Sequence, residues 1–354
     1  VLEPLPHKKK TALTPLIEEL HAVLKENTGG EREYKRYLDS LKASVLTAFY
    51  TPEPVTDAIM RMLYNAGVVP VRALEPSAGT GAFAEYLRRY NEEAEITCFE
   101  KDPLTGLILR HLHPDDTVRV QGLETIEPAY EGHFDLITSN IPFGDVSLFD
   151  PAFSSSRDPV RRQGAWAIHN YFFMKSVDLV RAGGLIAFIT SQGMADAERN
   201  RPVREWLMER CDLVAAVRLP NNLFTDHAGT EVGSDLIVLQ KNSAARPLSE
   251  RQRDFIETRT LSNGITVNNS FRSLDRVVQT SAKVGTNPYG KPAMEFTHAG
   301  GVEGIARALA DMLAEDMERH FNRELYESHA PKTAPRQYRE RQTETVSPRQ
   351  AHDD

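Results

Sequence analysis

Cysteine is scarce in this chain of 354 residues, which contains only Cys98 and Cys211, each within an apolar run typical of a strand. This number excludes a disulfide framework, and no metal-ligand spacing surrounds either residue, so we expect no bound metal. A reducing cytoplasm fits such cysteine usage. No apolar run reaches the roughly 18–20 residues of a membrane span. The basic stretch His7–Lys10 precedes no long apolar segment and therefore does not predict a signal peptide.

An excess of positive charge is also missing. The formal net charge of −8 argues against a broad basic nucleic-acid face, although a local basic groove remains compatible with it. The phosphate-loop pattern of nucleotide hydrolases does not occur, so no helicase-like part is predicted within the chain. With 40% hydrophobic and 26% charged residues, the composition is typical of a globular protein that buries a sizeable core.

Hydrophobic periodicity predicts an α/β fold between helical extensions. Helical stripes cover residues 12–27, 33–48 and 54–66. From residue 70, short apolar runs alternate with helical stretches, which predicts a doubly wound, mostly parallel sheet. No helical pattern separates the last two strands, so we expect an antiparallel end to the sheet. The seven predicted strands are Arg72–Glu75, Ile96–Glu100, Thr117–Val120, Phe134–Asn140, Leu185–Thr190, Leu213–Leu219 and Asp235–Gln240, and the helices between them span 82–90, 103–111, 166–182 and 197–210.

These patterns divide the chain into four parts. Residues 1–66 form a helical N-terminal segment, and residues 67–241 form the α/β domain. Residues 242–328 are a small, polar accessory segment that ends in one amphipathic helix over 301–326. Residues 329–354 lack apolar periodicity, which predicts a disordered tail or linker.

The segment between the first strand and the next helix predicts a ligand site. Gly79 and Gly81 let the backbone turn sharply and approach a ligand closely. Glu100 ends the next strand, where an acidic side chain can bind a ribose diol. The third glycine of the dinucleotide pattern is absent, and Glu75 would repel a diphosphate but attract a cationic methionine moiety. The pattern therefore favours S-adenosylmethionine, held by Glu75, Pro76, Ser77, Ala78, Gly79, Thr80, Gly81, Phe83 and Glu100.

A second segment, Asn140-Ile141-Pro142-Phe143, closes the fourth strand at the edge where parallel sheets bind ligands. A side-chain amide oxygen and a backbone carbonyl can accept both N–H groups of an exocyclic amine, which points its lone pair at a sulfonium methyl group. An aromatic face can hold a base that has left the duplex. We therefore assign Asn140 and the Ile141 carbonyl as acceptors and Phe143 as the stacking platform.

Three motifs resemble those of γ-type N6-adenine DNA methyltransferases. Asn140–Phe143 is similar to the Asn-Pro-Pro-Phe/Tyr motif of amino-group methyltransferases, and Glu75–Phe83 is similar to their cofactor motif. Tyr50-Thr51-Pro52 resembles the motif that contacts the methionine end of the cofactor in the γ-type enzymes, and the order of the three is the γ order. The resemblance implies a Rossmann-like S-adenosylmethionine methyltransferase that methylates adenine N6 in double-stranded DNA after base flipping.

The most detailed likeness, over about residues 45–325, is to methylase regions of large mobile-element and phage methylase-helicase proteins. It implies a role in restriction-modification or anti-restriction, with a helicase-like or specificity region as partner. Within the family pattern, Ile141 replaces the usual proline. The carbonyl survives this change, whereas the rigidity of the loop does not follow from the sequence.

The resemblance assigns further residues, each with a structural alternative. It places Lys101 and Leu123 beside the cofactor and His169 and Phe172 at the wall of the base pocket, where loop or core packing is the alternative. The long loop 145–165 follows the catalytic motif and is expected to grip phosphates, the alternative being a solvated charge cluster; its arginines are Arg157, Arg161 and Arg162.

Other functions remain open at this point. Enzymes with an Asn-Pro-Pro-Tyr motif also methylate protein glutamine and RNA. Ser139 leaves a cytosine-N4 register of the motif as a minor alternative. Ile141, the acidic net charge and the missing recognition domain are compatible with a catalytically weak or inactive module that binds cofactor or DNA.

Overall fold

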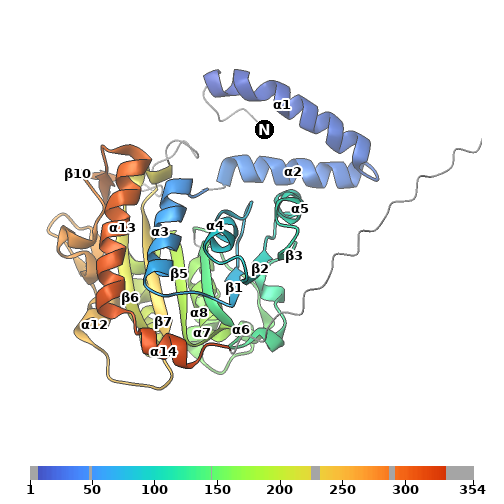
Figure 1. Cartoon of the computed structure of the whole chain (residues 1–354). Helices are drawn as coiled ribbons and strands as arrows, with labels where there is room; N and C mark the ends of the chain where they lie inside the picture. The colour runs from blue at the N-terminus through green and yellow to red at the C-terminus, as the bar shows by residue number, and fades with distance from the viewer. Residues whose placement is uncertain (1–6, 48–49, 145, 225–231, 287–291, 332–354) are drawn as a thin grey trace, which may run out of the picture.

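The computed structural model describes residues 7–47, 50–144, 146–224, 232–286 and 292–331. Its centre is a seven-stranded sheet of order β3-β2-β1-β4-β5-β7-β6 (Figure 1). The strands are β1 (Arg72–Glu75), β2 (Glu95–Phe99), β3 (Thr117–Arg119), β4 (Phe134–Asn140), β5 (Val180–Ser191), β6 (Cys211–Leu219) and β7 (Ser234–Lys241). All seven predicted strands are confirmed.

The sheet is mostly parallel, with the predicted antiparallel pairing of its last two strands. β7 pairs antiparallel with both β5 and β6, and the other neighbouring strands pair in parallel. β7 lies one position inside the edge, because it is inserted between β5 and β6. β4, β5 and β7 are buried along almost their whole length, as continuous apolar runs covered on both faces require. Both cysteines are buried and free.

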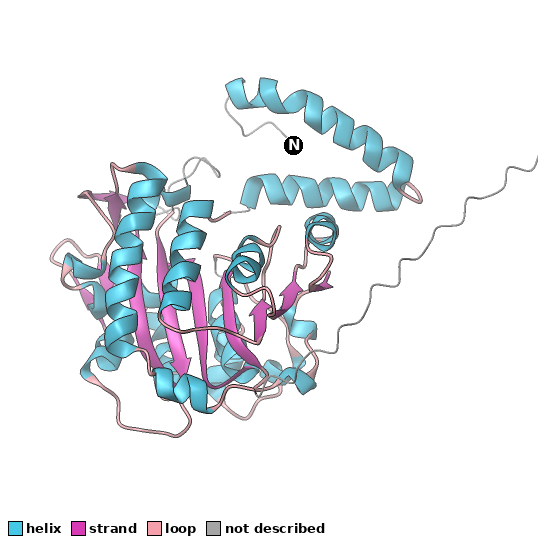
Figure 2. Ribbon diagram, in the orientation of Figure 1, coloured by secondary structure: helices cyan, strands magenta, loops and turns pink. Residues whose placement is uncertain are grey.

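Helices cover the two faces of the sheet (Figure 2). One face carries α3 (Glu53–Asn65), α4 (Ala82–Tyr90), α5 (Pro103–Leu112) and α13 (Gly301–His320), whose apolar residues share one core cluster. The other face carries α8 (Ile168–Leu179), α10 (Arg201–Met208) and α12 (Glu250–Ile256) over a second cluster. Helices from the N-terminal and accessory segments therefore contribute directly to the core of the central sheet.

Two further helices, α1 (His7–Asn27) and α2 (Glu31–Thr47), form an antiparallel pair beyond the edge at which the parallel strands end (Figure 1). The Ser40 hydroxyl of α2 donates to the carboxylate of Asp102 at 2.5 Å, which attaches α2 to the start of α5. No helix in the described ranges is both long and apolar enough to cross a membrane.

The expectation of an irregular loop over 145–165 is wrong. The segment contains α6 (Pro151–Ser154) and α7 (Pro159–Gly164). The side chains of Asp150 and Asp158 cap these helices, because each accepts the N–H of the residue two positions later at 2.8 Å. Proline follows each aspartate, where its missing N–H costs nothing.

Three other boundaries differ from the prediction. The helix expected over 301–326 ends at His320, and α14 (Arg323–Ser328) begins after Asn322, whose side chain caps it at Leu325 N. The helix expected over 166–182 ends at Leu179, because the next residues join β5. The helix expected over 197–210 is divided into η3 (Glu198–Asn200) and α10.

Residues 242–300 are more regular than their composition indicates. They contain two antiparallel two-stranded sheets, β8 (Thr258–Thr260) with β9 (Thr266–Asn268) and β10 (Ser281–Thr286) with β11 (Pro292–Thr297). The remaining short elements are η1 (Leu123–Thr125), η2 (Pro128–Tyr130), α9 (Gly193–Asp196), η3 (Glu198–Asn200), η4 (Asn221–Phe224), η5 (Asn269–Phe271) and η6 (Leu274–Arg276). Most of the predicted disordered tail, residues 332–354, lies outside the described residues.

Candidate cofactor and catalytic site

The glycine loop between β1 and α4 has left-handed backbone at Gly79 (φ +56°) and Gly81 (φ +91°). A Cβ added at Gly81 would overlap the His113 ring, so this glycine permits the close packing of α4 on α5. A Cβ at Gly79 would lie 3.3 Å from the Tyr50 ring. The structure therefore brings the Tyr50-Thr51-Pro52 segment against the loop, with Thr51 buried and Pro52 at the start of α3.

Glu75 holds this loop in place from its inner side. Its carboxylate accepts hydrogen bonds from Ala84 N (2.8 Å) and Phe83 N (3.4 Å) in the first turn of α4. These bonds replace a side-chain cap, because Gly81 occupies the N-cap position. The side chain is 1% exposed, and burial raises the pKa of Glu75 well above its usual value.

Glu100 joins the end of β2 to the same loop. Its Oε2 accepts from Gly79 N and its Oε1 from Asp102 N, both at 2.8 Å. Burial raises the pKa of this carboxylate. The exposed Lys101, which directly follows Glu100, forms an ion pair with Glu124 at 3.2 Å. Glu124 belongs to η1, as does the buried Leu123, so this pair joins η1 to the end of β2. The predicted cofactor residues of β1, β2 and η1 thus converge on one end of the sheet.

The segment predicted to be catalytic is tied to the glycine loop. The Ser139 hydroxyl donates to Ser77 O at 2.9 Å, and Asn140 follows as the last residue of β4. Ile141 N donates to Ile189 O in β5 at 3.0 Å, and the Ile141 side chain is 1% exposed. Proline could not donate this bond. Here the hydrogen bond to β5 and the burial of the Ile141 side chain fix the loop, whereas the family motif has a rigid proline ring at this position.

Phe143 lies against a residue that no motif assigns from the sequence. Its ring meets the ring of Phe224 edge-on, with centroids 6.1 Å apart and planes at 73°. Phe224 is fully buried in η4, which directly follows β6 at the same edge of the sheet. No pattern in the sequence analysis marks Phe224, because its contact with Phe143 joins two residues that lie far apart in the chain.

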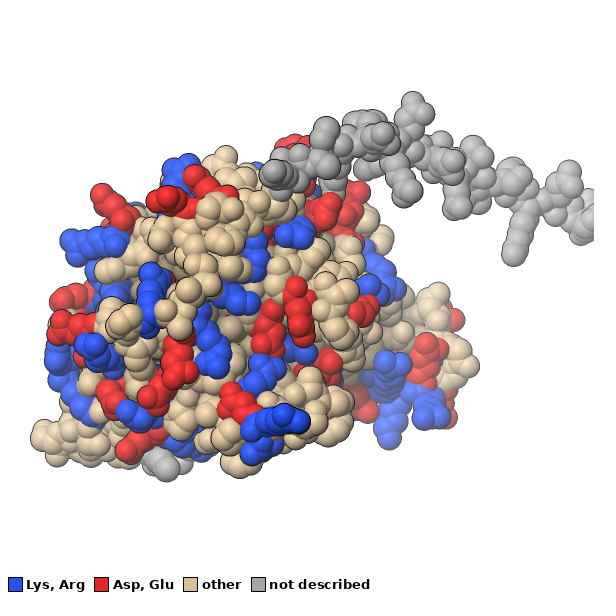
Figure 3. Space-filling model, turned by 90° about the horizontal axis from the view of Figure 1, so that it is seen from below, with Lys and Arg blue, Asp and Glu red and all other residues tan. Residues whose placement is uncertain are grey.

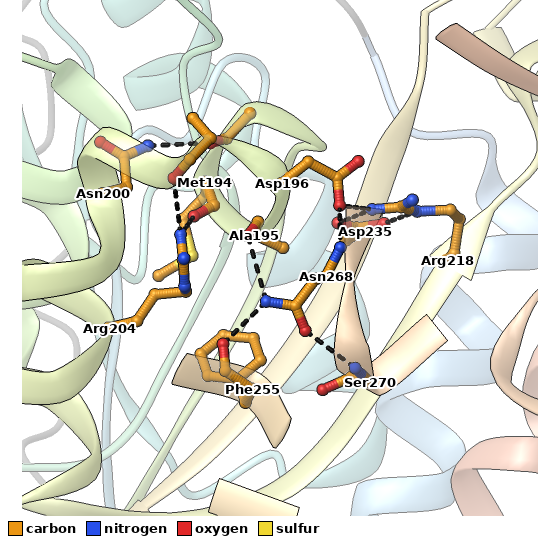
Figure 4. Close-up of polar contacts among 12 residues, drawn as sticks. Met194, Ala195, Asp196, Asn200, Arg204, Arg218, Asp235, Phe255, Asn268 and Ser270 are labelled. Carbon is orange, nitrogen blue, oxygen red and sulfur yellow. Dashed lines mark hydrogen bonds and ion pairs between the residues drawn. The ribbon is translucent and has the colours of Figure 1, made fainter. Parts of the chain in front are cut away.

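Buried polar contacts fix the strands around this edge (Figure 4). The Arg218 guanidinium, at the end of β6, donates to Asp235 of β7 and Asp196 of α9, each at 2.9 Å. Asn268 N of β9 donates to Asp196 at 2.8 Å, and its amide donates to Phe255 O at 2.7 Å. Arg218 is 2% exposed, so removal of one partner would leave a buried charge and cost about 3–5 kcal/mol. The accessory segment is thereby fastened beside β6.

His169 and Phe172 lie in the core rather than on an open pocket wall. They are residues of α8 and are 2% and 5% exposed, respectively. The His169 Nε2 atom is 3.4 Å from the amide nitrogen of Asn200, and the Phe172 ring contacts Tyr171. Core packing, the alternative kept open for this stretch, describes their position.

The arginines after the catalytic motif do not lie beside it. Arg161 donates to both carboxylate oxygens of Asp178, at 2.8 and 2.7 Å. Asp178 precedes the first residue of β5, so this pair lies at the amino edge of the sheet, opposite Asn140. Arg162 and Arg157 belong to the same α7 region, where Arg162 donates to Ser156 O at 2.6 Å. α6 and α7 return the chain to the amino edge, so the arginines expected to grip phosphates lie away from Asn140.

The amino edge shows positive and negative side chains interspersed (Figure 3). An open cavity of about 910 Å³ there is lined by Arg161, Trp206, Arg210 and Lys241 among others. Ion pairs of Arg161 with Asp178 and of Arg210 with Glu209 balance its charge. In the part of the chain that the structure describes, no group of three His, Cys, Asp or Glu side chains could hold a metal ion.

The chain is similar in sequence to curated proteins of which it covers only part. The chain is 26% identical over 203 residues to "Defense against restriction protein B" of Escherichia phage P1, which covers 56% of this chain and 8% of that protein. It is 26% identical over 278 residues to the type II methyltransferase M.XamI of Xanthomonas campestris pv. amaranthicola, covering 73% of this chain and 52% of that one. The chain thus spans about half or less of the length of these relatives.

Solved structures resemble the chain at low sequence identity. A modification subunit of a putative type I restriction enzyme from Vibrio vulnificus YJ016 covers 79% of this chain, with 64% of its own length matched, at 16% identity and a TM-score of 0.47. A putative class I S-adenosylmethionine-dependent methyltransferase from Listeria monocytogenes covers 63%, with 72% of its own length matched, also at 16% and 0.47. The family model named N-6 DNA Methylase matches residues 36–294, and the chain therefore belongs to the N-6 DNA methylase family.

Proposed function

We propose that this chain transfers a methyl group from S-adenosylmethionine to N6 of adenine in DNA. The observation that supports it best is the hydrogen bond of 2.9 Å from Ser139 to Ser77 O. It holds the cofactor loop directly beside Asn140, the side chain best suited to accept an N–H of an exocyclic amine. Reaction partners bound by the loop and by Asn140 would therefore meet at the carboxyl edge of β4.

The family implies S-adenosylmethionine, and the loop fits it on its own chemistry. Left-handed glycines permit close approach of a ligand, and two carboxylates, of the buried Glu75 and the half-buried Glu100, are unfavourable neighbours for phosphate. Tyr50, Gly79, Glu100 and Leu123 are the residues that would hold the cofactor. When bound, it supplies an electrophilic methyl group on a sulfonium.

The chain's own residues orient the nucleophile. An amine conjugated to a purine ring is a poor nucleophile, because its lone pair is delocalised. The Asn140 amide oxygen and the Ile141 carbonyl accept its two N–H groups, which favours a tetrahedral nitrogen with its lone pair directed at the methyl group. The Ile141 N–H bond to Ile189 O fixes the position of that carbonyl segment. Phe143 presents an aromatic face to an extruded base, and Phe224 supports its ring edge-on.

The names of the relatives support DNA as the substrate class, since one is a type II methyltransferase and another a phage protein named for defense against restriction. Both are longer than the segment they share with this chain. We therefore include in the proposal a helicase-like or specificity region that acts together with this methylase segment, in a restriction-modification or anti-restriction role.

The test is methylation of DNA that lacks modified bases, with labelled cofactor and the 354-residue chain. The wild type is expected to incorporate label that base-resolution sequencing assigns to N6-methyladenine. Asn140→Ala should lose about 10²–10³-fold in kcat, the loss typical of one transition-state hydrogen bond. Asn242→Ala is the matched control, because that amide lies after β7 at the opposite edge.

Label found only in protein or RNA would replace DNA by the corresponding substrate. Label at cytosine N4 would correct the target base. An unchanged rate for Asn140→Ala would remove Asn140 from the reaction.

A further inference from the structure

The β10–β11 hairpin extends beyond the edge of the sheet at which Asn140 lies. Val277 forms a parallel bridge with Arg218, and Val278 N donates to Arg218 O at 2.9 Å. Because this pairing is parallel, the chain after Val278 leaves in the direction of β6 and passes the end of that strand. Figure 1 shows β10 at the upper left, at the end of the sheet to which α2 is attached.

The hairpin is joined to the segment that supports Phe143. Asn221 Oδ1 accepts from Phe296 N at 2.9 Å, and Asn222 Oδ1 accepts from His298 N at 3.0 Å. The amide of Asn222 also donates to His298 O at 3.1 Å. Both asparagines belong to η4, whose last residue is Phe224. The end of β11 is therefore fixed to the aromatic wall of the proposed base pocket.

Beyond this anchor, β10 is exposed. The strand pairs Lys283 with Glu295 and Val284 with Met294. Phe296 of β11 is buried in the core, whereas Val284 is 57% exposed and the Lys283 side chain is 66% exposed. Lys283, whose ammonium group forms an ion pair with Glu295 at 3.1 Å, and Val284 are thus presented on opposite faces of a two-stranded ribbon next to the catalytic edge.

We propose that the β10–β11 hairpin contacts the base pairs beside the target adenine, as a ribbon in the major groove of duplex DNA. This inference rests on the proposed function. A two-stranded ribbon fits the major groove, where a lysine on the face toward the bases donates to guanine O6 and N7. A base that enters the pocket leaves the duplex, so an element joined to the pocket wall lies beside that position. The hairpin then sets the preference for neighbouring bases.

The experiment compares Lys283→Glu and Val284→Asp with a charge-reversed control, Arg253→Glu. Arg253 is an exposed cation of α12, whose Gln252 donates to Cys211 O at the opposite edge of the sheet. Fluorescence anisotropy measures affinity for a duplex at two salt concentrations. Modification sequencing of a random duplex library gives the preferred flanking bases, and a single-stranded adenine oligonucleotide reports on the pocket alone.

Lys283→Glu is expected to weaken duplex binding about tenfold and to flatten the preference at one flanking position. The slope of log affinity against log salt concentration should change by about one unit, whereas Lys283→Arg retains the wild-type slope and flanking preference. Val284→Asp, on the opposite face of the ribbon, retains the wild-type flanking preference. Methylation of the single strand and the cofactor affinity of both hairpin variants remain unchanged, as do all readouts for Arg253→Glu.

Wild-type duplex affinity and flanking preference in Lys283→Glu would overturn the inference while leaving the proposed function intact. Equal losses on single-stranded and duplex substrates would also overturn it, because they indicate a disturbed pocket rather than a lost groove contact. A wild-type chain that neither binds nor methylates DNA would refute the proposed function and this inference together.

Discussion

Replacement of Ile141 by the proline usual in the family is predicted to destabilise this particular protein. Proline removes the N–H that donates to Ile189 O at 3.0 Å. An intramolecular hydrogen bond contributes about 0.5–1.5 kcal/mol net, and a buried carbonyl left without a donor costs about 1–3 kcal/mol. The smaller ring also fills less of a site that is 1% exposed in the wild type. Reduced entropy of the unfolded chain offsets about 0.4–1 kcal/mol. We expect a net loss of about 1–4 kcal/mol in the free energy of unfolding.

The control is Ile141→Val, which keeps the N–H and removes one methylene group at a cost of about 0.5–1.5 kcal/mol. Urea unfolding measures both variants, and single-turnover methylation measures the chemistry. Because proline retains the carbonyl that is proposed to accept the amine, Ile141→Pro should stay within about tenfold of the wild-type rate, far above Asn140→Ala. Equal stability of the wild type and Ile141→Pro, or a larger loss in Ile141→Val, would refute the role assigned to the bond.

Two further predictions follow from charged groups. Burial raises the pKa of Glu75, so the apo protein should lose stability as the pH rises through this raised pKa, whereas affinity for the cationic cofactor should increase over the same pH range. Glu75→Gln should remove both pH dependences, which denaturant titration and calorimetry at several pH values would measure. Arg161→Ala should lower the free energy of unfolding by about 1 kcal/mol and leave KM for DNA unchanged, because Arg161 pairs with Asp178 at the amino edge; a tenfold rise in KM would show instead that this arginine contacts DNA.

The strands and the two ligand segments are visible in the sequence, because their determinants are local. Continuous apolar runs predict buried parallel strands, and the glycines and acidic residues around Glu75 and Glu100 predict the ligand loop. The same local logic gives Asn140 a place at a strand end. Each of these predictions needs only a few neighbouring residues.

The rest depends on contacts between distant residues. The Asp-Pro pairs at 150 and 158 are helix-start signals, but helices of four and six residues carry no periodicity to reveal them. Nothing local shows that Arg161 meets Asp178 or that Phe224 meets Phe143. The bond that compensates for Ile141 joins β4 to β5 and is equally invisible before the strands are aligned.

The insertion of β7 between β5 and β6 has a consequence for folding. β6 is made before β7, yet it has no partner in the sheet until β7 arrives, because β7 alone joins it to β5. The folding route with the lower loop-closure entropy cost is for β6 and β7 to pair first as a local antiparallel unit, which then docks through β7 onto β5. Since η4 lies between β6 and β7 in the chain, the same docking step brings Phe224 against Phe143. The parallel half of the sheet can therefore form before the proposed base pocket exists.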